Sequence, residues 1–196
     1  MEITENAALV VVDVQQGFDD LESWGPRNNP AADENIASLI AAWQDTGRPV
    51  VFVRHDSTKP DSPLRPGQPG NDLKGYVEQR RGLGKGPELF ITKTVNSAFY
   101  GTPDLDAWLK AKGITQIAIA GIQTNMCAET TARMGGNLGY DVLFAFDATY
   151  TFDQAGPFGW NLTADELSRA TAVTLHGGGF AQVVTAEALV SAAFSA

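Results

Sequence analysis

Six short apolar runs, separated by polar and loop-forming residues, constrain the fold of this chain more than any other feature of its sequence. The first run begins at Ala7 and meets no polar residue until the carboxylate of Asp13. Uninterrupted runs of this kind are typical of parallel strands, which are covered on both faces. The expected strands cover residues 7–13, 49–54, 89–93, 116–120, 141–147 and 181–184.

Segments with helical spacing lie between these runs. Ile36, Leu39, Ile40 and Trp43 recur at the spacing of one helix face, and Asp33 before them is the expected N-cap. Similar patterns predict helices over residues 33–43, 104–111, 126–138, 163–175 and 185–193. Alternating strands and helices predict one three-layer α/β/α domain over residues 1–196. Its sheet would hold six parallel strands in the order 3-2-1-4-5-6.

Charge and cysteine content exclude several classes of protein. The net charge is −9 and the pI is near 4.6, which argues against nucleic-acid binding because phosphates need a basic surface. The single cysteine cannot form an internal disulfide, which favours a reducing compartment. An acidic N-terminus and no long apolar stretch predict neither a signal peptide nor a membrane span. We therefore expect a cytoplasmic protein with a small-molecule partner.

Three chemically competent side chains follow the first, third and fourth expected strands. They are Asp13, Lys93 and Cys127. In a doubly wound sheet, ligands bind beyond the carboxyl ends of the strands, where the strand order reverses. Asp13 could accept the thiol proton of Cys127, and Lys93 could supply a cation beside them. The amides of residues 122–127 could stabilise a tetrahedral oxyanion.

Each of these residues also has a structural interpretation. A lone cysteine is often a small buried core residue, and an aspartate after a strand can cap the next turn. A lysine such as Lys93 is more often solvated or ion-paired. Their convergence on one sheet edge favours a shared catalytic role.

Four segments resemble the isochorismatase-like cysteine hydrolases, which include nicotinamidases, N-carbamoyl amidases and streptothricin hydrolases. These segments cover residues 11–18, residues 92–93 together with 97–102, residues 121–133 and residues 147–149. The resemblance implies that Cys127 is the nucleophile, that Asp13 is the base and later the acid, and that Lys93 holds this pair. It also implies a cis peptide bond at Ile122–Gln123, which would aim the amides of Gln123 and Cys127 at the oxyanion. A homo-oligomer, either a dimer or a tetramer, is implied as well.

Histidine content narrows the expected substrate. Nicotinamidases bind a metal through an aspartate and histidines after strand two, but this chain has only His55 and His176. The sequence from Asp56 to Thr58 lacks the Asp-x-His spacing. We therefore expect no metal and no cofactor. The predicted reaction is cleavage of a C–N bond in a small amide, lactam or N-carbamoyl compound through a Cys127 thioester. The alternatives are a vinyl-ether hydrolase of the isochorismatase type and a non-catalytic binding protein on the same fold.

Two long loops, residues 57–72 and 148–162, are expected near the site, the first as a lid or pocket wall. The predicted substrate-binding residues lie at strand ends or in loops, where aromatic side chains suit a pocket lining. The same aromatic residues could instead pack the loops onto the body. The predicted substrate-binding residues are Phe18, His55, Phe99, Tyr100 and Trp160.

Overall fold

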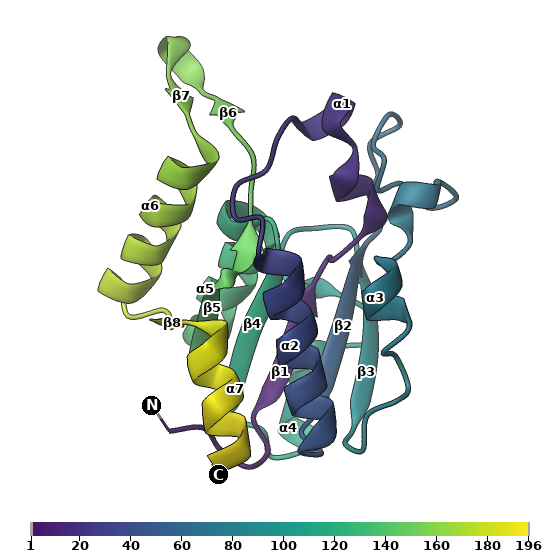
Figure 1. Ribbon diagram of the computed structural model, residues 1–196, viewed down its shortest axis with the longest axis vertical. Helices are drawn as coiled ribbons and strands as arrows, with labels where there is room; N and C mark the ends of the chain where they lie inside the picture. Colours follow the sequence, from purple (N-terminus) through teal and green to yellow (C-terminus); the bar gives the residue numbers. More distant parts are fainter. Residues whose placement is uncertain (1, 196) are drawn as a thin grey trace.

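A six-stranded parallel sheet forms the centre of the molecule, in the order β3-β2-β1-β4-β5-β8 (Figure 1). The computed structural model describes residues 2–195. The predicted order is confirmed, with β8 in the sixth place because β6 and β7 form a separate antiparallel ribbon. The strands are β1 (Ala8–Val12), β2 (Val50–His55), β3 (Glu88–Lys93), β4 (Gln116–Ile122), β5 (Asp141–Tyr150), β6 (Gln154–Ala155), β7 (Asn161–Leu162) and β8 (Gln182–Val184).

Helices cover both faces of this sheet, as a parallel sheet requires. In Figure 1, α2 and α7 lie in front of the sheet, whereas α4 and α5 lie behind it. The helices are α1 (Leu21–Trp24), α2 (Ala32–Asp45), α3 (Gly75–Glu78), α4 (Leu105–Ala111), α5 (Glu129–Asn137), α6 (Ala164–Gly177) and α7 (Ala186–Ser195). No helix within residues 2–195 is long and apolar enough to cross a bilayer.

Strand β1 shows how the sheet divides the core into two layers. Val11 faces the layer under α2 and α7, and Val10 faces the layer under α4 and α5. All five residues of β1 are buried, so this strand has no solvent-facing side. The uninterrupted apolar run in the sequence is therefore explained by burial on both faces.

The start of α2 differs from the prediction at Asp33. The helix begins at Ala32 with Ala31 as its N-cap, so the expected N-cap role of Asp33 is wrong. The Asp33 carboxylate instead accepts hydrogen bonds from Arg27, Lys74 and Tyr76 at 2.7–3.3 Å. Two of these partners lie more than 40 positions along the chain, and local sequence spacing cannot reveal them.

Glycine is required where β4 passes β1. Gly121 has φ of +128°, and a Cβ built on it would lie 2.0 Å from the carbonyl oxygen of Val12. An L-residue with a side chain disfavours this φ, and no backbone can accommodate that approach. The close contact lies immediately beside Asp13, so Gly121 sets how β4 meets the end of β1.

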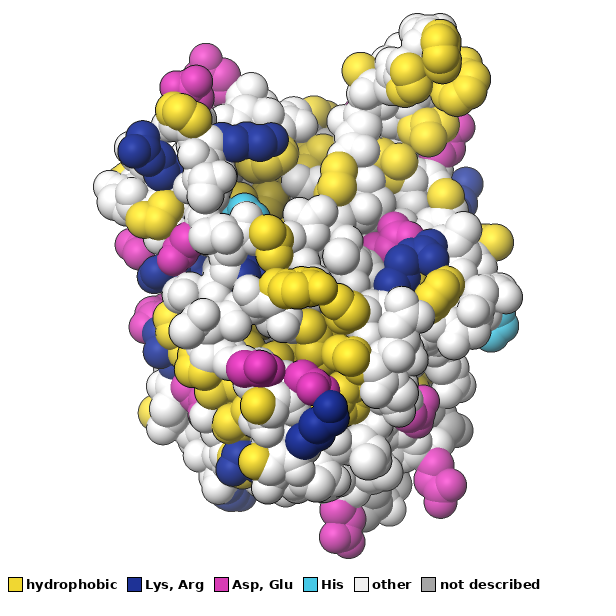
Figure 2. All heavy atoms as spheres, turned by 180° about the vertical axis from the view of Figure 1, so that it is seen from behind, with side chains coloured by type: hydrophobic (Ala, Val, Ile, Leu, Met, Phe, Trp, Pro, Cys, Tyr) yellow, Lys and Arg dark blue, Asp and Glu magenta, His cyan; other side chains and the backbone are white. Residues whose placement is uncertain are grey.

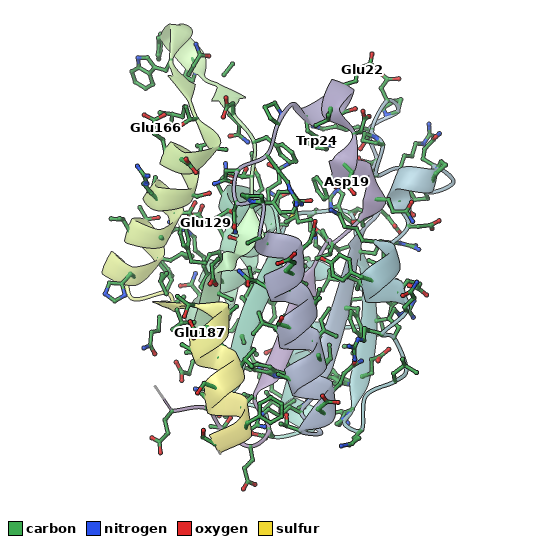
Figure 3. The ribbon with its side chains drawn as sticks, in the orientation of Figure 1. Asp19, Glu22, Trp24, Glu129, Glu166 and Glu187 are labelled. Atoms are coloured by element: carbon green, nitrogen blue, oxygen red, sulfur yellow. The ribbon has the colours of Figure 1, made fainter. Side chains whose placement is uncertain are left out.

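The predicted loop 148–162 contains regular structure. Strand β5 continues to Tyr150, and β6 and β7 then form a hairpin that projects beyond the carboxyl ends of the sheet (Figure 1). Apolar side chains gather at the tip of this projection, at the upper right of Figure 2. Among them, Phe158 is 89% exposed and Trp160 is 66% exposed. On the other side of the sheet end, Asp19 and Trp24 lie in the segment that includes α1 (Figure 3).

The loop over residues 57–72 packs against the end of the sheet. Asn71 is buried, and its side-chain amide donates hydrogen bonds to the carbonyls of Leu64 and His55, at 2.8 and 3.1 Å. Leu64 is itself buried in the core layer under α2. This part of the loop is therefore anchored to the end of the sheet, and its role as a lid or pocket wall stays a prediction.

Candidate active site

Asp13 follows β1 in a backbone conformation that few residues adopt. Its φ is +51°, its side chain is fully buried, and its N–H donates to the carbonyl of Val53 at 2.9 Å. Non-glycine residues with positive φ cost free energy and cluster at functional sites. The turn carries the carboxylate away from the strand direction and into the layer behind the sheet.

Lys93 is the ion-pair partner of this carboxylate. The distance from Lys93 Nζ to Asp13 Oδ2 is 2.6 Å, and both side chains are completely buried. Burial opposes the charged form of Lys93, but the neighbouring Asp13 and Cys127 outweigh it and raise the lysine pKa. Lys93 is therefore an ammonium ion at neutral pH. The second carboxylate oxygen, Asp13 Oδ1, is buried and has no hydrogen-bond partner within residues 2–195.

Cys127 lies in a π-helical turn, Thr124–Ala128, between β4 and α5. The prediction placed it in the first turn of an α-helix, whereas the α-helix begins only at Glu129. The thiol is nearly buried, at 8% exposure. A carboxylate oxygen of Asp13, a ring nitrogen of His55 and Cys127 Sγ all lie within 4.8 Å of one another. The structure thus brings the thiol, the carboxylate and the ammonium together.

The charge state of the thiol follows from this setting. Burial raises the pKa of Cys127, the negative charge of Asp13 raises it further, and Lys93 only partly offsets both effects. The resting side chain is therefore a neutral thiol that needs a base before it can attack. The Sγ atom also lies 3.9 Å from Asn96 Oδ1, a residue that the sequence interpretation missed because no motif marks it.

His55 closes one side of this cluster. Its Nδ1 lies 3.2 Å from Lys93 Nζ, and its side chain is only half-buried. Burial lowers the pKa of His55, and the Lys93 charge lowers it further. Of the five predicted substrate-binding residues, His55 is the one that hydrogen-bonds to Asp13, Lys93 or Cys127 within the described chain.

The four aromatic residues that were predicted to bind substrate lie in different environments from that of His55. Phe18 is 5% exposed and packs with Trp24 at 5.1 Å between ring centroids. Phe99 stacks on Tyr140 at 5.7 Å, and Tyr100 is largely exposed. Trp160 lies on the projecting hairpin, where its ring meets Phe158 edge-on. Their substrate-binding roles remain predictions.

The Ile122–Gln123 peptide bond is cis, as the resemblance implied. Gln123 is nearly buried, and its side-chain oxygen accepts a hydrogen bond from the Thr151 hydroxyl at 3.3 Å. Thr124 similarly donates to the Thr149 hydroxyl at 2.9 Å. The turn before Cys127 is therefore tied to the end of β5. The oxyanion role of the Gln123 and Cys127 amides remains a prediction.

The side chains after β2 do not fit a metal ion of the nicotinamidase type. The Asp56 carboxylate is paired with Arg54 at 2.8 Å and also accepts a hydrogen bond from Asn71 at 3.0 Å. Asp13, His55 and Cys127 are metal-ligand residue types within reach of one another. However, the Lys93 ammonium already contacts Asp13 and His55 at 2.6 and 3.2 Å. A second cation at this point would meet strong repulsion.

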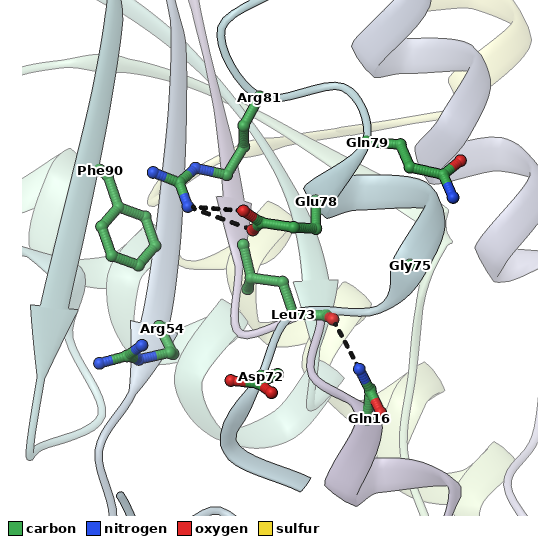
Figure 4. Close-up of a pocket in the computed structure, with 9 residues that line it drawn as sticks. All are labelled: Gln16, Arg54, Asp72, Leu73, Gly75, Glu78, Gln79, Arg81 and Phe90. Carbon is green, nitrogen blue, oxygen red and sulfur yellow. Dashed lines mark hydrogen bonds and ion pairs between the residues drawn. The ribbon is translucent and has the colours of Figure 1, made fainter. Parts of the chain in front are cut away.

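A separate cavity of about 510 Å³ lies on the other face of β2 (Figure 4). We call it the Arg54 groove. Its lining residues are Gln16, Arg54, Asp72, Leu73, Gly75, Glu78, Gln79, Arg81 and Phe90. The Arg54 guanidinium lies 5.6 Å and the Arg81 guanidinium 4.1 Å from the Phe90 ring centroid. The lining residues include no cysteine, serine, threonine, histidine or lysine.

Comparisons with known proteins show the family and the fold of this chain. The family model described as "Isochorismatase domain" matches residues 7–174. The uncharacterized isochorismatase family protein YrdC of Bacillus subtilis is 38% identical over 187 residues, with 95% of this chain and 96% of YrdC covered. Nicotinamidase 3 of Arabidopsis thaliana is 30% identical, with 93% and 86% covered. A crystal structure of a putative isochorismatase-family hydrolase from Chromobacterium violaceum superposes with a TM-score of 0.90. The two chains are 38% identical, and the superposition covers 100% of this chain and 98% of the Chromobacterium violaceum chain.

The fold, the matched domain and these relatives define a hydrolase of the three-layer α/β/α type. The chain belongs to the isochorismatase family. Members of this family are hydrolases, and amidohydrolases are among them.

Proposed function

We propose that this protein is a cysteine hydrolase that cleaves a C–N bond of a small amide, lactam or N-carbamoyl compound without a metal ion. The observation that carries the proposal is the buried Asp13–Lys93 pair at 2.6 Å beside a neutral thiol. A base and a nucleophile within reach of each other are the signature of covalent catalysis. The nicotinamidase relative acts, by its name, on an amide, which supports this substrate class.

Acylation begins at the thiol. The Cys127 sulfur attacks the acyl carbon while its proton moves to Asp13, whose Oδ1 has no other partner within residues 2–195. The amides of Gln123 and Cys127 would stabilise the oxyanion of the tetrahedral intermediate. Asp13 then returns the proton to the departing nitrogen. The C–N bond breaks and a thioester remains on Cys127. The nitrogen leaves as an amine or ammonia or, when the substrate is a lactam, stays attached to the acyl chain as a free amine.

Deacylation repeats these roles with water. Asp13 removes a proton from water as the oxygen attacks the thioester carbon, and it then returns the proton to the sulfur. The C–S bond breaks, the acid product leaves and the thiol is restored. Lys93 remains charged throughout, so Asp13 alternates between carboxylate and carboxylic acid beside a fixed cation.

Replacement of the sulfur tests the proposal. A panel of amides, lactams and N-carbamoyl compounds should be screened for amine or ammonia release by the wild-type protein and by Cys127→Ala. We expect activity only in the wild-type protein, and mass spectrometry of a rapidly quenched reaction should show the acyl mass on Cys127. Turnover that survives in Cys127→Ala would exclude the thioester. It would show that the C–N bond is cleaved without the thiol, for example by direct attack of water.

A further inference from the structure

His55 and Lys93 are direct neighbours across two parallel strands. The register of β2 and β3 pairs His55 with Lys93, and both side chains lie on the face that also holds Cys127. Their side chains meet at 3.2 Å between His55 Nδ1 and Lys93 Nζ. The Lys93 ammonium therefore has two partners, because it also donates to Asp13 Oδ2 at 2.6 Å.

This contact selects one form of the imidazole ring. An ammonium group has three donors and no acceptor, so the nitrogen that faces it must carry a lone pair. His55 Nδ1 is then the acceptor, and the ring proton resides on Nε2. A doubly protonated ring would place an N–H and a positive charge against the Lys93 ammonium.

The charged and titratable groups around the ring come from four segments. Lys93 on β3 opposes protonation of His55. Asp13 after β1, Asp56 after β2 and the carbonyl of Val95 favour it. Cys127 Sγ lies within 4.8 Å of a ring nitrogen and is a neutral thiol. Burial and Lys93 prevail over the two carboxylates, so the pKa of His55 is lowered and the ring is neutral at pH 7.

The backbone of His55 is fixed from two directions. Gln15, which is fully buried, accepts the His55 N–H at 2.8 Å and donates its amide to the His55 carbonyl at 3.0 Å. Asn71 donates to the same carbonyl at 3.1 Å. The N–H of Gln15 also donates to the carbonyl of Asp13 at 2.8 Å. One buried glutamine thus couples the position of His55 to that of Asp13, although neither its role nor that of Asn71 is visible in a sequence motif.

We propose that His55 is a positioning residue, which accepts a hydrogen bond from the Lys93 ammonium through Nδ1 and so holds Lys93 against Asp13 Oδ2. This role rests on the proposed function, because it keeps Asp13 Oδ1 available for the thiol proton. Protonation of His55 removes the acceptor and adds a like charge, which displaces Lys93. His55 therefore sets the acid limb of the activity profile.

Two substitutions separate this role from a merely structural one. In His55→Asn, the side-chain oxygen can take the place of Nδ1 but cannot titrate. In His55→Leu, no acceptor remains. His176→Asn is the matched control, because His176 is the other histidine of the chain and is exposed on α6. The profiles of kcat and KM between pH 5 and 8 would be measured on the best substrate from the amide panel.

We expect kcat of His55→Leu to fall by ~10–100-fold, the range of a hydrogen bond to a charged group, while KM changes little. His55→Asn should lose less kcat than His55→Leu, and its kcat should not show the wild-type decrease toward low pH. His176→Asn should retain the wild-type profile. An unchanged acid limb in His55→Asn, or equal losses of kcat in the Asn and Leu variants, would overturn the proposal.

The tautomer of His55 can be determined by NMR in the absence of substrate. Long-range proton–nitrogen NMR spectra contain signals from only two histidines, and His176→Asn assigns them. We expect a neutral His55 ring with its proton on Nε2 at pH 7. A proton on Nδ1, or a doubly protonated ring at that pH, would refute the contact. Because this readout uses the resting protein, it stands apart from Cys127→Ala, whose continued turnover would refute only the thioester.

Discussion

The two faces of β2 end in very different environments, although consecutive residues supply them. His55 points to the proposed reaction site, where charges are buried, paired and crowded around a thiol. Arg54 points to the Arg54 groove, a cavity of about 510 Å³ with half-exposed ion pairs. After β1, Gln15 contacts His55, whereas Gln16, the first residue of a 3-10 helix, lines the groove. A period of two along extended chain therefore separates two sites that share one backbone.

The two faces of β2 show that the volume of a cavity does not indicate which reactive side chains lie in it. A well-formed cavity is the usual first candidate for an active site, yet the groove has no nucleophile next to a base. The reaction site is recognised by a different signal, namely charged side chains that are fully buried and paired with each other. Substitutions on the two faces should therefore differ in the size and kind of their effect.

The largest difference is expected for Asp13→Asn. This change leaves the buried Lys93 ammonium without a charged partner and removes the proposed base. Loss of one partner of a buried pair typically costs about 3–5 kcal/mol, and loss of a general base slows turnover by ~10²–10⁴-fold. Urea unfolding and the amide assay would measure both. Activity near the wild-type level would contradict the assignment of Asp13 as the base.

An intermediate difference is expected between two glycines. Gly121→Ala would force a Cβ to within 2.0 Å of the Val12 carbonyl oxygen, whereas the Cβ of Gly75→Ala, on the groove side, would meet no atom within 4 Å. We expect Gly121→Ala to lose at least ~2 kcal/mol of unfolding free energy, as strained or overpacked positions do. Gly75→Ala should change stability by less than ~1 kcal/mol. Equal urea midpoints for Gly121→Ala and Gly75→Ala would show that β1 and β4 can move apart without loss of unfolding free energy.

The smallest effect is expected for Arg54→Gln. The Arg54–Asp56 pair is partly exposed, and Asp56 retains its hydrogen bond from Asn71 at 3.0 Å. Partly exposed pairs contribute about 0–1 kcal/mol, so unfolding free energy and kcat should both stay close to wild type. A tenfold loss of kcat would show that a change in the Arg54 groove affects the proposed reaction site. The two faces of β2 would then not be independent.

Much of the sheet could be predicted because apolar runs report burial on both faces directly. β1, β2 and β4 follow from such runs, and the strand order follows from the doubly wound architecture that alternating strands and helices imply. Asp13, Lys93 and Cys127 were selected by their positions after strands. The family resemblance supplied the cis bond at Ile122–Gln123, which no local pattern encodes.

Features that depend on distant partners could not be predicted. Asp33 was expected to cap a helix because nothing nearby reveals Lys74 and Tyr76. The β6–β7 hairpin has strands of only two residues, too short to show alternation. Gln15 and Asn71 support His55 through backbone groups, which leave no trace in residue spacing.

The ion pair between Lys93 and Asp13 joins residues that are 80 positions apart in the chain. Asp13 and Cys127 are brought together by the contact of β1 with β4, an even longer connection. Such non-local contacts form slowly because a long loop must close before they are gained. A partly folded chain that has its helices but lacks the contact of β1 with β4 therefore contains every proposed catalytic residue but not the assembled site. Enzymatic activity would thus report assembly of β3, β2, β1 and β4 into one sheet, whereas helical content would not.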